Sequence, residues 1–321
     1  MNSVRQIRTE EARLKFTSPE TGQGKSIFVP GGIANFPLAF ARKSIRDLHG
    51  LPASLGRIGA LEVRLATRKG EIRKAQKLRF KVFYQEGGAI PDMRSKLTRR
   101  DICPFDRICD HLIVVDHDFV NRFGRRKPKI IGAYRLLRRD VAEAHGGFYS
   151  AGEFDIAPLL ARHPEKRFLE LGRSCVHRDW RGKRTLELMW RGIWTYVRHH
   201  RVDAMIGCAS LPGAGPLAHA AALSFLHHHA TAPEEWRVDA LPRARVGMDM
   251  LDADKINARK ALAGLPPLVK GYLRLGAKVG RGAVVDRQFG TTDVFVVMPI
   301  TDIDARYIDY FSGPAPERAA A

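Results

Sequence analysis

The amino-acid sequence predicts an α/β domain in which helices flank a mixed, mostly antiparallel central sheet. Strand-like and helix-like segments alternate along the chain instead of gathering in separate regions, which is typical of one layered domain. Two strand-like segments, 111–116 and 130–138, are joined by a very basic connection, which favours antiparallel neighbours. The 321 residues have an apolar content of 45%, enough to fill a substantial core.

Each element follows from the spacing of its apolar residues. Strands are predicted where apolar residues alternate with polar ones or form short runs. In chain order these strands are 61–66, 111–116, 130–138, 168–176, 203–210 and 294–300. Helices are predicted where apolar residues recur every three or four positions. In chain order these helices are 68–86, 185–201 with a buried face of Leu186, Trp190, Ile193 and Val197, 215–229, 252–262 and one before the C-terminal tail.

The predicted organisation is a single domain over 58–312. Residues 1–57 contain turn formers and only short apolar runs, so they form an N-terminal extension of uncertain order, and 313–321 form a flexible tail. Residues 85–109 lack periodicity and contain several Gly and Pro, which is typical of a mobile loop over a site.

The charge balance favours an anionic partner. Lys and Arg number 54 against 34 Asp and Glu, so the formal net charge is +20. Nucleic acid, an acidic protein and an anionic membrane surface all fit this charge. The sequence contains no nucleic-acid motif and no interleaved basic and aromatic platform, so nucleic acid ranks lowest. Residues 121–139 alone hold eight Arg or Lys and no acid.

The cysteines and the apolar runs indicate the compartment. Four cysteines without a CxxC pair favour neither a disulfide scaffold nor zinc, and they fit a reducing cytosol. The N-terminus lacks the apolar region of a secretory signal. Every apolar run is shorter than the roughly 18 to 20 residues that span a bilayer. We therefore expect a cytoplasmic protein that can touch a membrane without crossing it.

The segment 266–281 has two contrasting sides when it is read as a helix. Its apolar side comprises Leu268, Tyr272, Leu275 and Val279. Its basic side comprises Lys270, Arg274, Lys278 and Arg281. The pattern is that of a helix in a membrane interface, and a surface helix with its apolar side toward the core is the alternative.

A basic turn joins the strand 168–176 to the following helix. A helix that starts directly after a strand presents unpaired N–H groups and the positive end of its dipole, which suit a phosphate. Arg181, Lys183 and Arg184 add full charges around Gly182. The alternative is an ordinary solvated basic loop.

Glu170 and Arg173 lie within one apolar strand. Alternation places Leu169 and Leu171 on one face and Glu170 on the other, in mostly apolar surroundings. A buried carboxylate needs a partner or a function. Glu170 either pairs with Arg173 or Arg135, accepts a proton from a substrate, or holds a substrate cation.

The remaining polar groups give no metal site. Asp106 and Asp110 form an acidic pair in a basic region, but no third ligand stands at a suitable spacing. The histidine runs 199–200 and 227–229 place neighbouring side chains on different faces of a helix, so they do not converge easily on one ion. Helix capping and local ion pairs explain the two aspartates as well.

The strand, turn and helix from Val176 to Leu186 resemble motif A of the GNAT acyltransferases. In that motif, glycines after the first Arg-Gly let the backbone approach the pyrophosphate of coenzyme A. This sequence has Arg184 and Leu186 at the last two glycine positions. The resemblance therefore implies a GNAT-like fold, and it implies acyl carrier protein, with one phosphate and an acidic surface, as the better donor.

Further landmarks look like those of acyl-homoserine lactone synthases. They are Arg79, Phe83, Asp106 with Asp110, Arg135 in Gly-x-x-Arg-Leu-Leu, and Glu170 with Arg173. The aspartates are four apart where that family usually has three, and no Trp follows Phe83 at the family position. The segments CDHLIVV, ELGRSCV, LPPLVKGYLRLGA and DRQFGTTDVFVVMPI are more similar to the ornithine lipid-forming N-acyltransferases, also called hemolysin-like.

This resemblance covers roughly 60–311 and implies a reaction. A 3-hydroxy fatty acyl group would move from acyl carrier protein to the α-amine of L-ornithine, giving lyso-ornithine lipid without a bound cofactor. The resemblance assigns catalysis to Glu170, as base or ammonium anchor, with Arg173 orienting it. Substrate binding falls to Arg79, Phe83, Asp106, Asp110 and Arg135. The aspartates would hold the δ-ammonium, and Arg135 or Arg79 would pair the carboxylate or tie the acids in place. Strand N–H groups near Cys175 would stabilise the oxyanion.

The implied partners are acyl carrier protein, docked on the phosphate site of Arg181, Gly182, Lys183 and Arg184, and the anionic inner face of the cytoplasmic membrane. A downstream O-acyltransferase is a further expected partner. Nucleic acid is not expected as a partner. The alternatives are a homoserine-lactone-type signal synthase, an enzyme for lysine or glutamine, and a basic membrane-surface protein without catalysis.

Overall fold

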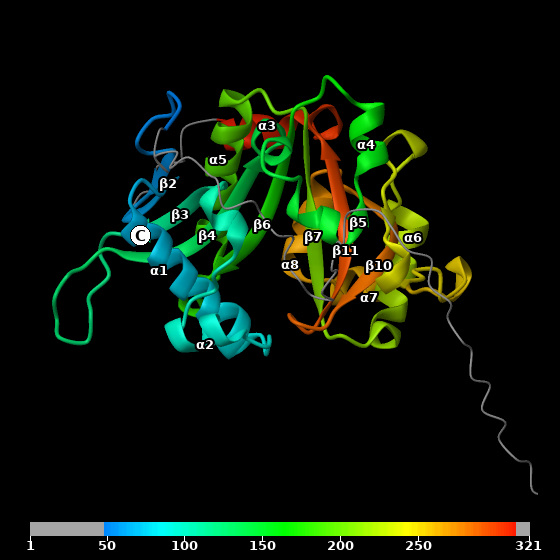
Figure 1. Cartoon of the computed structure of the whole chain (residues 1–321), viewed down its shortest axis with the longest axis horizontal. Coiled ribbons are helices and arrows are strands. Elements are labelled where there is room, and N and C mark those ends of the chain that lie inside the picture. The colour runs from blue at the N-terminus through cyan, green and yellow to red at the C-terminus, as the bar shows by residue number, and fades with distance from the viewer. Residues whose placement is uncertain (1–47, 313–321) are drawn as a thin grey trace, which may run out of the picture. The chain divides into compact units, whose positions relative to one another are not determined.

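The computed structural model describes residues 48–312, which form one sheet with helices on both faces (Figure 1). These residues belong to one compact unit of the chain. Its strands are β1 (Gly56–Ile58), β2 (Leu61–Leu65), β3 (Asp110–Asp116), β4 (Lys129–Arg138), β5 (Phe154–Asp155), β6 (Phe168–Val176), β7 (Ala204–Pro212), β8 (Asp239–Ala240), β9 (Arg245–Val246), β10 (Lys278–Asp286) and β11 (Thr291–Pro299). Its α-helices are α1 (Lys69–Phe80), α2 (Met93–Thr98), α3 (Arg139–Glu143), α4 (Ala157–Arg162), α5 (Lys183–His199), α6 (Ala220–Ala230), α7 (Ala258–Gly264), α8 (Pro267–Arg274) and α9 (Ala305–Ser312).

The sheet is mixed and mostly antiparallel, which confirms the predicted fold class. Its strand order is β1-β2-β3-β4-β6-β7-β11-β10-β8-β5, and β9 pairs with β10. Among the described strands, β6 with β7 and β8 with β10 are the parallel pairs. β3 and β4 form the expected antiparallel pair, in which His111 faces Arg135. The central strands read from the sequence therefore lie side by side in the middle of the sheet.

Helix α5 covers one face of the sheet. Its Leu188 and Ile193 are fully buried and pack with Leu112 and Val114 of β3. α6 and α8 contribute to the same core. Leu186, predicted on the buried face of this helix, is instead 42% exposed. The buried face of α5 is rotated from the predicted one, because Thr185, Leu188 and Met189 face the core instead.

The opposite face is covered by α1 and by the segment that contains α3 and α4. Ile72 and Ala75 of α1 pack against Ile113 and Val115 of β3. The α4 segment packs against the inner strands β6 and β11 through a second apolar cluster. Strand alternation in β3 thus supplies both faces, as a sheet between two helical layers requires.

The domain begins before residue 58. Leu51 and Leu55 are buried in the core, and β1 pairs with β2. Residues 48–57, predicted to belong to the N-terminal extension, are therefore part of the fold. The rest of that extension and the tail 313–321 lie outside the described residues.

The segment 85–109 has more structure than a loop. It contains the end of a π-helical turn, Lys81–Glu86, which continues α1, then α2 and a short 3₁₀ turn, Pro104–Arg107. Ser95 is 1% exposed, so part of this segment is packed into the domain. The local pattern missed α2 because four of its six residues are charged or hydroxylated.

The segment 266–281 is not one amphipathic helix. α8 ends at Arg274, and Lys278 begins strand β10 within the sheet. Tyr272 is buried, and its hydroxyl lies 2.5 Å from that of Tyr134 on β4. The apolar side of α8 therefore faces the core. The membrane-interface interpretation of this segment is wrong, and the core-facing alternative is confirmed.

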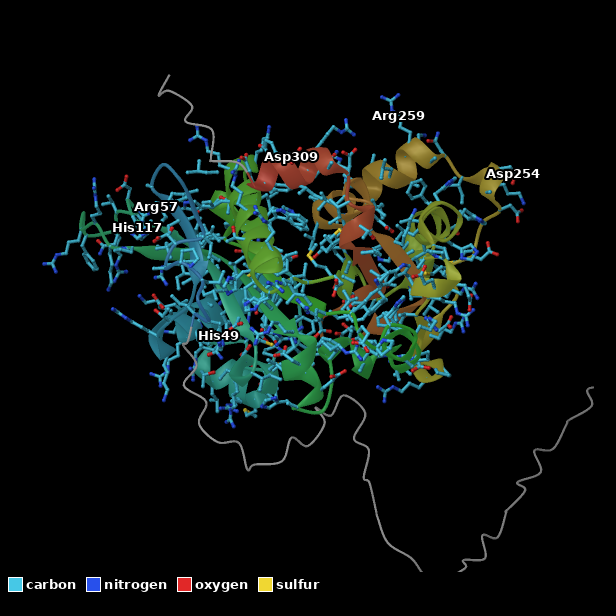
Figure 2. The ribbon with its side chains drawn as sticks, turned by 90° about the horizontal axis from the view of Figure 1, so that it is seen from above. His49, Arg57, His117, Asp254, Arg259 and Asp309 are labelled. Carbon is cyan, nitrogen blue, oxygen red and sulfur yellow. The ribbon has the colours of Figure 1, made fainter. Side chains whose placement is uncertain are left out.

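Arg57, Glu62 and His117 form a charged cluster beside the edge strand β1. Arg57 donates to Oε1 of Glu62 at 2.9 Å, and His117 lies 2.7 Å from Oε2 of the same carboxylate (Figure 2).

No helix within residues 48–312 is both long enough and apolar enough to cross a membrane.

Candidate functional site

The sheet opens between β6 and β7, and polar residues gather beside this opening. These parallel strands stop pairing at Glu170↔Ile206, although both continue. Beyond that point β6 stays paired with β4, and β7 with β11. At the divergence a Cβ on Gly207 would lie 2.4 Å from the carbonyl oxygen of Leu171, so glycine is required. A small cavity lined by Leu171, Gly207 and Cys208 occupies the opening.

A buried arginine ties α1 to the loop after α2. Arg79 is 1% exposed and donates to both carboxylate oxygens of Asp106, at 2.8 and 2.7 Å. Its Nε lies 2.8 Å from Oδ2 of Asp101. Burial alone would raise the pKa of Asp106, but Arg79 outweighs burial and holds that pKa well below its usual range. The family resemblance implies that Asp106 holds a substrate ammonium. Both of its oxygens instead accept from Arg79, which argues against that role.

Two further arginines extend this group, which we call the arginine network: Arg79, Asp101, Asp106, Arg135 and Arg173. Arg173 lies in a left-handed bulge of β6, with φ of 53°, and donates to the hydroxyl of Tyr149 at 3.2 Å. Its Nε and Nη1 of Arg135 are buried without a hydrogen-bond partner. Their ion pairs with Asp101 and Asp106 are longer, 3.4 and 3.7 Å. These two arginines therefore retain donors for an anion.

Glu170 is buried, as alternation predicts, but its partners differ from the predicted ones. Oε1 accepts hydrogen bonds from the backbone N–H and the hydroxyl of Ser150, at 2.7 and 2.5 Å. Oε2 accepts from the backbone N–H of Tyr149 at 2.9 Å. Glu170 forms no ion pair with Arg173 or Arg135, so the expected orienting contact is absent. The carboxylate holds the turn at Tyr149–Gly152 against β6.

Asp110 does not join Asp106. Its Oδ2 accepts from the hydroxyl of Tyr196 on α5 at 2.6 Å and lies 3.5 Å from Arg138. Asp106 contacts α1, on the opposite side of the sheet. The predicted acidic pair is therefore two separate structural carboxylates. Strand alternation could not relate them, because Asp106 lies in a 3₁₀ turn before the strand.

Phe83 lies beside the site, within the π-helical turn. Its ring packs edge-on against Phe289 with centroids 5.9 Å apart. The Arg173 guanidinium covers another part of Phe289, 4.4 Å from the ring centroid. The turn between β10 and β11 thus connects Phe83 to the arginine network.

The basic turn between β6 and α5 carries more charge than the sequence motif indicated. Gly182 is the N-cap of α5, and no side chain caps the N-terminus of this helix. Lys183 and Arg184 are exposed, whereas Arg181 pairs with Glu86 at 2.5 Å. The turn leaves first-turn N–H groups free for an anion.

Two lysines from other elements complete this basic surface. Nζ of Lys81 lies 2.9 Å and Nζ of Lys129 lies 3.4 Å from Nε2 of His177. Burial, then Lys129 and Lys81, lower the pKa of His177, so its neutral ring can accept from a lysine. Neither lysine forms an ion pair with a carboxylate of residues 48–312. No pattern in the sequence predicts this convergence.

Three carboxylates gather on the other side of the opening, and we call them the acidic cluster: Glu153, Asp286 and Asp293. One oxygen from each lies within 4.8 Å of the others. Glu153 follows the turn held by Glu170, Asp286 ends β10, and Asp293 lies in β11. None of the three was predicted. Asp293 had a signal, since it is an acid at an inward position of an apolar strand.

The thiols near the opening are not activated nucleophiles. Burial and the Glu153 carboxylate raise the pKa of Cys208, whose Sγ lies 3.5 Å from Oε2 of Glu153. Burial raises the pKa of Cys175 to about 12. Because the thiolate is the reactive form, neither cysteine favours a covalent acyl-enzyme.

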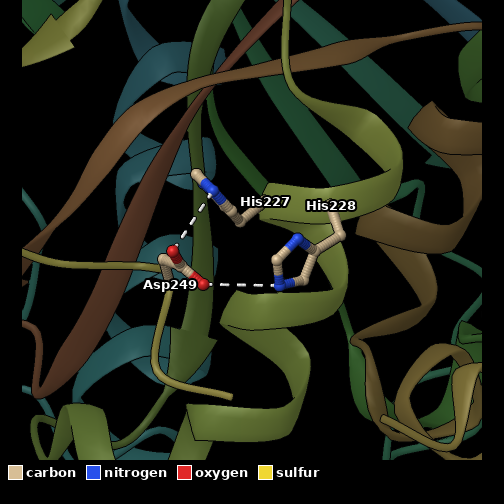
Figure 3. A group of neighbouring side chains, drawn as sticks. All are labelled: His227, His228 and Asp249. Atoms are coloured by element: carbon tan, nitrogen blue, oxygen red, sulfur yellow. Dashed lines mark ion pairs between the residues drawn. The ribbon is translucent and has the colours of Figure 1, made fainter. Parts of the chain in front are cut away.

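His227, His228 and Asp249 meet at the end of α6, where both rings point toward the carboxylate (Figure 3). Nε2 of His227 and Nε2 of His228 lie 3.9 and 3.4 Å from Asp249 oxygens. Neighbouring histidines of the helix thus converge better than predicted. However, Nε2 of His228 also lies 2.9 Å from the carbonyl oxygen of Leu251. A carbonyl accepts only from a protonated nitrogen, so this atom is not poised to bind a metal.

The sequence is similar to known acyltransferases. A family model described as an Acetyltransferase (GNAT) domain matches residues 78–191. A protein named L-ornithine N(alpha)-acyltransferase from Agrobacterium fabrum is 52% identical, over 85% of this chain and 91% of the relative. Proteins of the same name from Rhizobium meliloti and Brucella abortus are 51% and 49% identical, over 88% and 86% of this chain and 94% and 97% of each relative.

Solved structures with a similar arrangement are distant. An N-acyl amino acid synthase, FeeM, from uncultured soil microbes matches with a TM-score of 0.42 and 11% identity, over 75% of this chain and 92% of that one. The AHL synthase LasI matches with a TM-score of 0.41 and 13% identity, over 81% of this chain and 98% of that one.

Proposed function

The chain belongs to the family of L-ornithine N(alpha)-acyltransferases, and on this basis we propose that it transfers a 3-hydroxy fatty acyl group from acyl carrier protein to the α-amine of L-ornithine. The product is lyso-ornithine lipid. The observation that carries the proposal is the opening between β6 and β7, which has a basic surface, free arginine donors and buried carboxylates around it. The basic surface suits the phosphate of a carrier-bound thioester, the arginine donors suit the carboxylate of an amino acid, and the buried carboxylates suit its ammonium groups.

The basic turn of α5 is the proposed site for the phosphate of the pantetheine arm. The free N–H groups after Gly182, with Lys183 and Arg184, offer both the helix dipole and full charge. Lys81 and Lys129 add two cations without carboxylate partners. The side chains at Arg184 and Leu186, in place of glycines, favour one phosphate over a closely held pyrophosphate. An acidic carrier protein also complements the net charge of +20.

The opening itself is the proposed place of the thioester. The edge of β6 beyond Glu170 no longer faces a paired strand, so its N–H groups on that side can stabilise an oxyanion. The α-amine nitrogen attacks the thioester carbonyl carbon, the C–S bond breaks and the C–N bond forms. The amine loses a proton, and the pantetheine sulfur leaves as a thiol. No enzyme nucleophile is required.

Glu170 is the proposed base or ammonium anchor for the α-amine. Its carboxylate accepts three hydrogen bonds and has about four acceptor positions. One position on Oε2 remains for the amine or a bridging water. The amine must lose its proton before it attacks, since its pKa is roughly 8. Arg173 and Arg135 are the proposed partners of the amino-acid carboxylate, and Arg79 positions the loop beside them.

We also propose that the protein acts at the inner face of the cytoplasmic membrane, with α2 as the contact. Ile90, Met93 and Leu97 are each at least 67% exposed. Arg94 and Lys96 lie between them in the sequence and suit anionic headgroups. The product carries a fatty chain and a free 3-hydroxyl, so a downstream O-acyltransferase could consume it there.

The central test is incubation of the protein with 3-hydroxyacyl carrier protein and a panel of amino acids, with products read by mass. Ornithine should be acylated, while lysine, glutamine and S-adenosylmethionine should give little product. Glu170→Gln should lower turnover by about 10²–10⁴-fold. Glu235→Gln, whose side chain is 64% exposed, is the matched control and should act as wild type. Full turnover by Glu170→Gln would reject the role of Glu170.

Membrane contact has its own test. Flotation with vesicles that contain anionic lipid should recover the wild-type protein. Met93→Asp with Leu97→Asp should weaken that binding by about tenfold or more, because each exposed side chain loses its apolar burial in the bilayer. Leu262→Asp, at a half-exposed position outside α2, is the control. Equal binding of both variants would reject α2 as the contact.

A further inference from the structure

The acidic cluster has no role in the steps proposed above. Its oxygens lie within 4.8 Å of one another, although Glu153 and Asp293 come from segments 140 residues apart in the chain. Asp293 is 6% exposed, on the face of β11 that also carries the buried Phe295 and Val297. A carboxylate in such surroundings needs a partner, because an unpaired buried charge is costly.

The partner is absent among the described residues. None of the three carboxylates forms an ion pair with a lysine, arginine or histidine of residues 48–312. Oδ1 of Asp293 is fully buried and accepts no hydrogen bond. In a chain with a net charge of +20, three carboxylates that meet without a cation are unusual. The hydroxyls of Thr291 and Ser210 lie near this carboxylate, but neither donates a hydrogen bond to Oδ1.

The cluster lies next to the arginine network. The Asp286 carboxylate accepts from the backbone N–H groups of Gln288 and Phe289, which fixes the turn between β10 and β11. Phe289 in that turn stacks on the Arg173 guanidinium at 4.4 Å. Arg173 is close enough to oppose, in small part, the rise that burial causes in the pKa of Glu153 and of Asp293. It nevertheless forms no ion pair with either carboxylate. A positive and a negative pole therefore flank the opening between β6 and β7.

We propose that Glu153, Asp286 and Asp293 bind the side-chain ammonium of the acceptor amino acid. The inference rests on the proposed function, because it names the subsite that selects a basic amino acid. An ammonium group has three N–H donors, which matches three convergent carboxylates. With the α-carboxylate at Arg173, the acceptor lies across the opening, and its α-amine lies between the two poles.

An ammonium fits the cluster better than a divalent metal. Calcium takes six to eight oxygen ligands and magnesium an octahedral set, whereas three carboxylates converge here. One oxygen of Asp286 is already used by two backbone N–H groups, and one of Glu153 by the Cys208 thiol. The positive charge of the nearby Arg173 also repels a divalent metal ion more strongly than it repels a singly charged ammonium group.

The protonation of the free site agrees with this role. Burial and the neighbouring carboxylates raise the pKa of Glu153. Burial and Asp286 raise the pKa of Asp293, against the effect of the hydroxyls of Thr291 and Ser210. Like charges held together without a cation take up protons. An incoming ammonium would replace those protons as the compensating charge.

The experiment compares ornithine with norvaline, which has the same carbon skeleton without the δ-amine. Equilibrium binding of each amino acid to the full chain is measured by calorimetry, and acyl transfer is measured alongside. Wild type should bind ornithine at least about tenfold more tightly than norvaline, as expected for a hydrogen-bonded charge. Asp293→Asn and Glu153→Gln should remove that preference and leave norvaline binding unchanged. Asp254→Asn, at an exposed position that is not part of the cluster (labelled in Figure 2), is the matched control.

Each outcome decides the inference. If the two variants keep the wild-type preference for ornithine over norvaline, the inference is overturned while the proposed function stands. If wild type binds ornithine through the cluster but transfers no acyl group to it, the proposed function fails and the subsite is retained. Calorimetry with Mg²⁺, Ca²⁺ and Mn²⁺ is the third arm. Metal binding that the variants abolish, without a preference for ornithine, would identify a metal site and overturn the inference.

Discussion

The arginine network and the acidic cluster lie on the same face of the sheet and are built in opposite ways. In the network, Arg79 satisfies Asp101 and Asp106 inside the protein. In the cluster, three carboxylates meet without a cation, and one oxygen of Asp293 lacks any donor. Carboxylates with a buried cationic partner stabilise the fold, whereas carboxylates without one, and the unpaired donors of Arg135 and Arg173, are available to a ligand. Burial alone does not separate the two roles.

The largest expected effect is the removal of Arg79. Arg79→Met leaves two buried carboxylates without their partner, so the free energy of unfolding should fall by about 3–5 kcal/mol. Urea unfolding monitored by circular dichroism measures this loss. Arg178→Met, at a side chain that is 69% exposed, is the control and should change little. A loss below about 1 kcal/mol for Arg79→Met would show that the network is not what holds the loop.

Removal of Arg173 should affect binding more than folding. Arg173→Met should raise the KM for ornithine by about 10–100-fold, because a charged hydrogen bond to the carboxylate is lost. Steady-state kinetics at saturating acyl donor measures the effect, and kcat should change less. Arg173→Lys keeps the charge and should recover part of the loss. An unchanged KM in both variants places the carboxylate elsewhere.

The pH dependence of stability should have opposite signs in the two regions. The pKa of Asp106 is lowered in the folded state, so its contribution is present above its ordinary pKa and is lost as pH falls. Burial and the neighbouring carboxylates raise the pKa of Glu153 in the folded state. Between the ordinary and the raised pKa, the folded state therefore keeps a proton that the unfolded state has lost, and this proton favours folding. That contribution is lost as pH rises through the raised pKa.

Glu153→Gln tests this sign. The variant should match wild type near pH 4 to 5 and exceed its stability near pH 8, by on the order of 1 kcal/mol. Thermal melting across this range measures the difference. If the difference shrinks as pH rises, the pKa of Glu153 is not raised.

The smallest effect is expected at the surface. Arg57 pairs with Glu62 much as Arg79 pairs with Asp106, but its side chain is 61% exposed. Arg57→Gln should therefore lower the free energy of unfolding by about 0.5 kcal/mol or less. A loss as large as that of Arg79→Met would mean that burial is not what distinguishes the network.

The strands and the fold class could be predicted because their signals are local. The predicted strand 168–176 has the same bounds as β6, and the pairing of β3 with β4 followed from their basic connection. The placement of the candidate site residues was predicted in part, and their roles stay predictions. Arg79, Arg135, Glu170 and Arg173 do lie together, but the partners of Glu170 and of the aspartates were wrong. Which donor reaches a carboxylate depends on the bulge at Arg173 and on the turn before β3, and no periodicity encodes either.

The sequence by itself determined the sheet, its flanking helices, the family and the excess of positive charge, because apolar spacing and composition act along the chain. Only the tertiary structure decided which charges neutralise each other. It placed Asp106 and Asp110 on opposite faces, and it brought Glu153 to Asp286 and Asp293 across 140 residues. Charge pairing depends on distance and burial in three dimensions, and those are fixed when the strands pair and the sheet opens between β6 and β7.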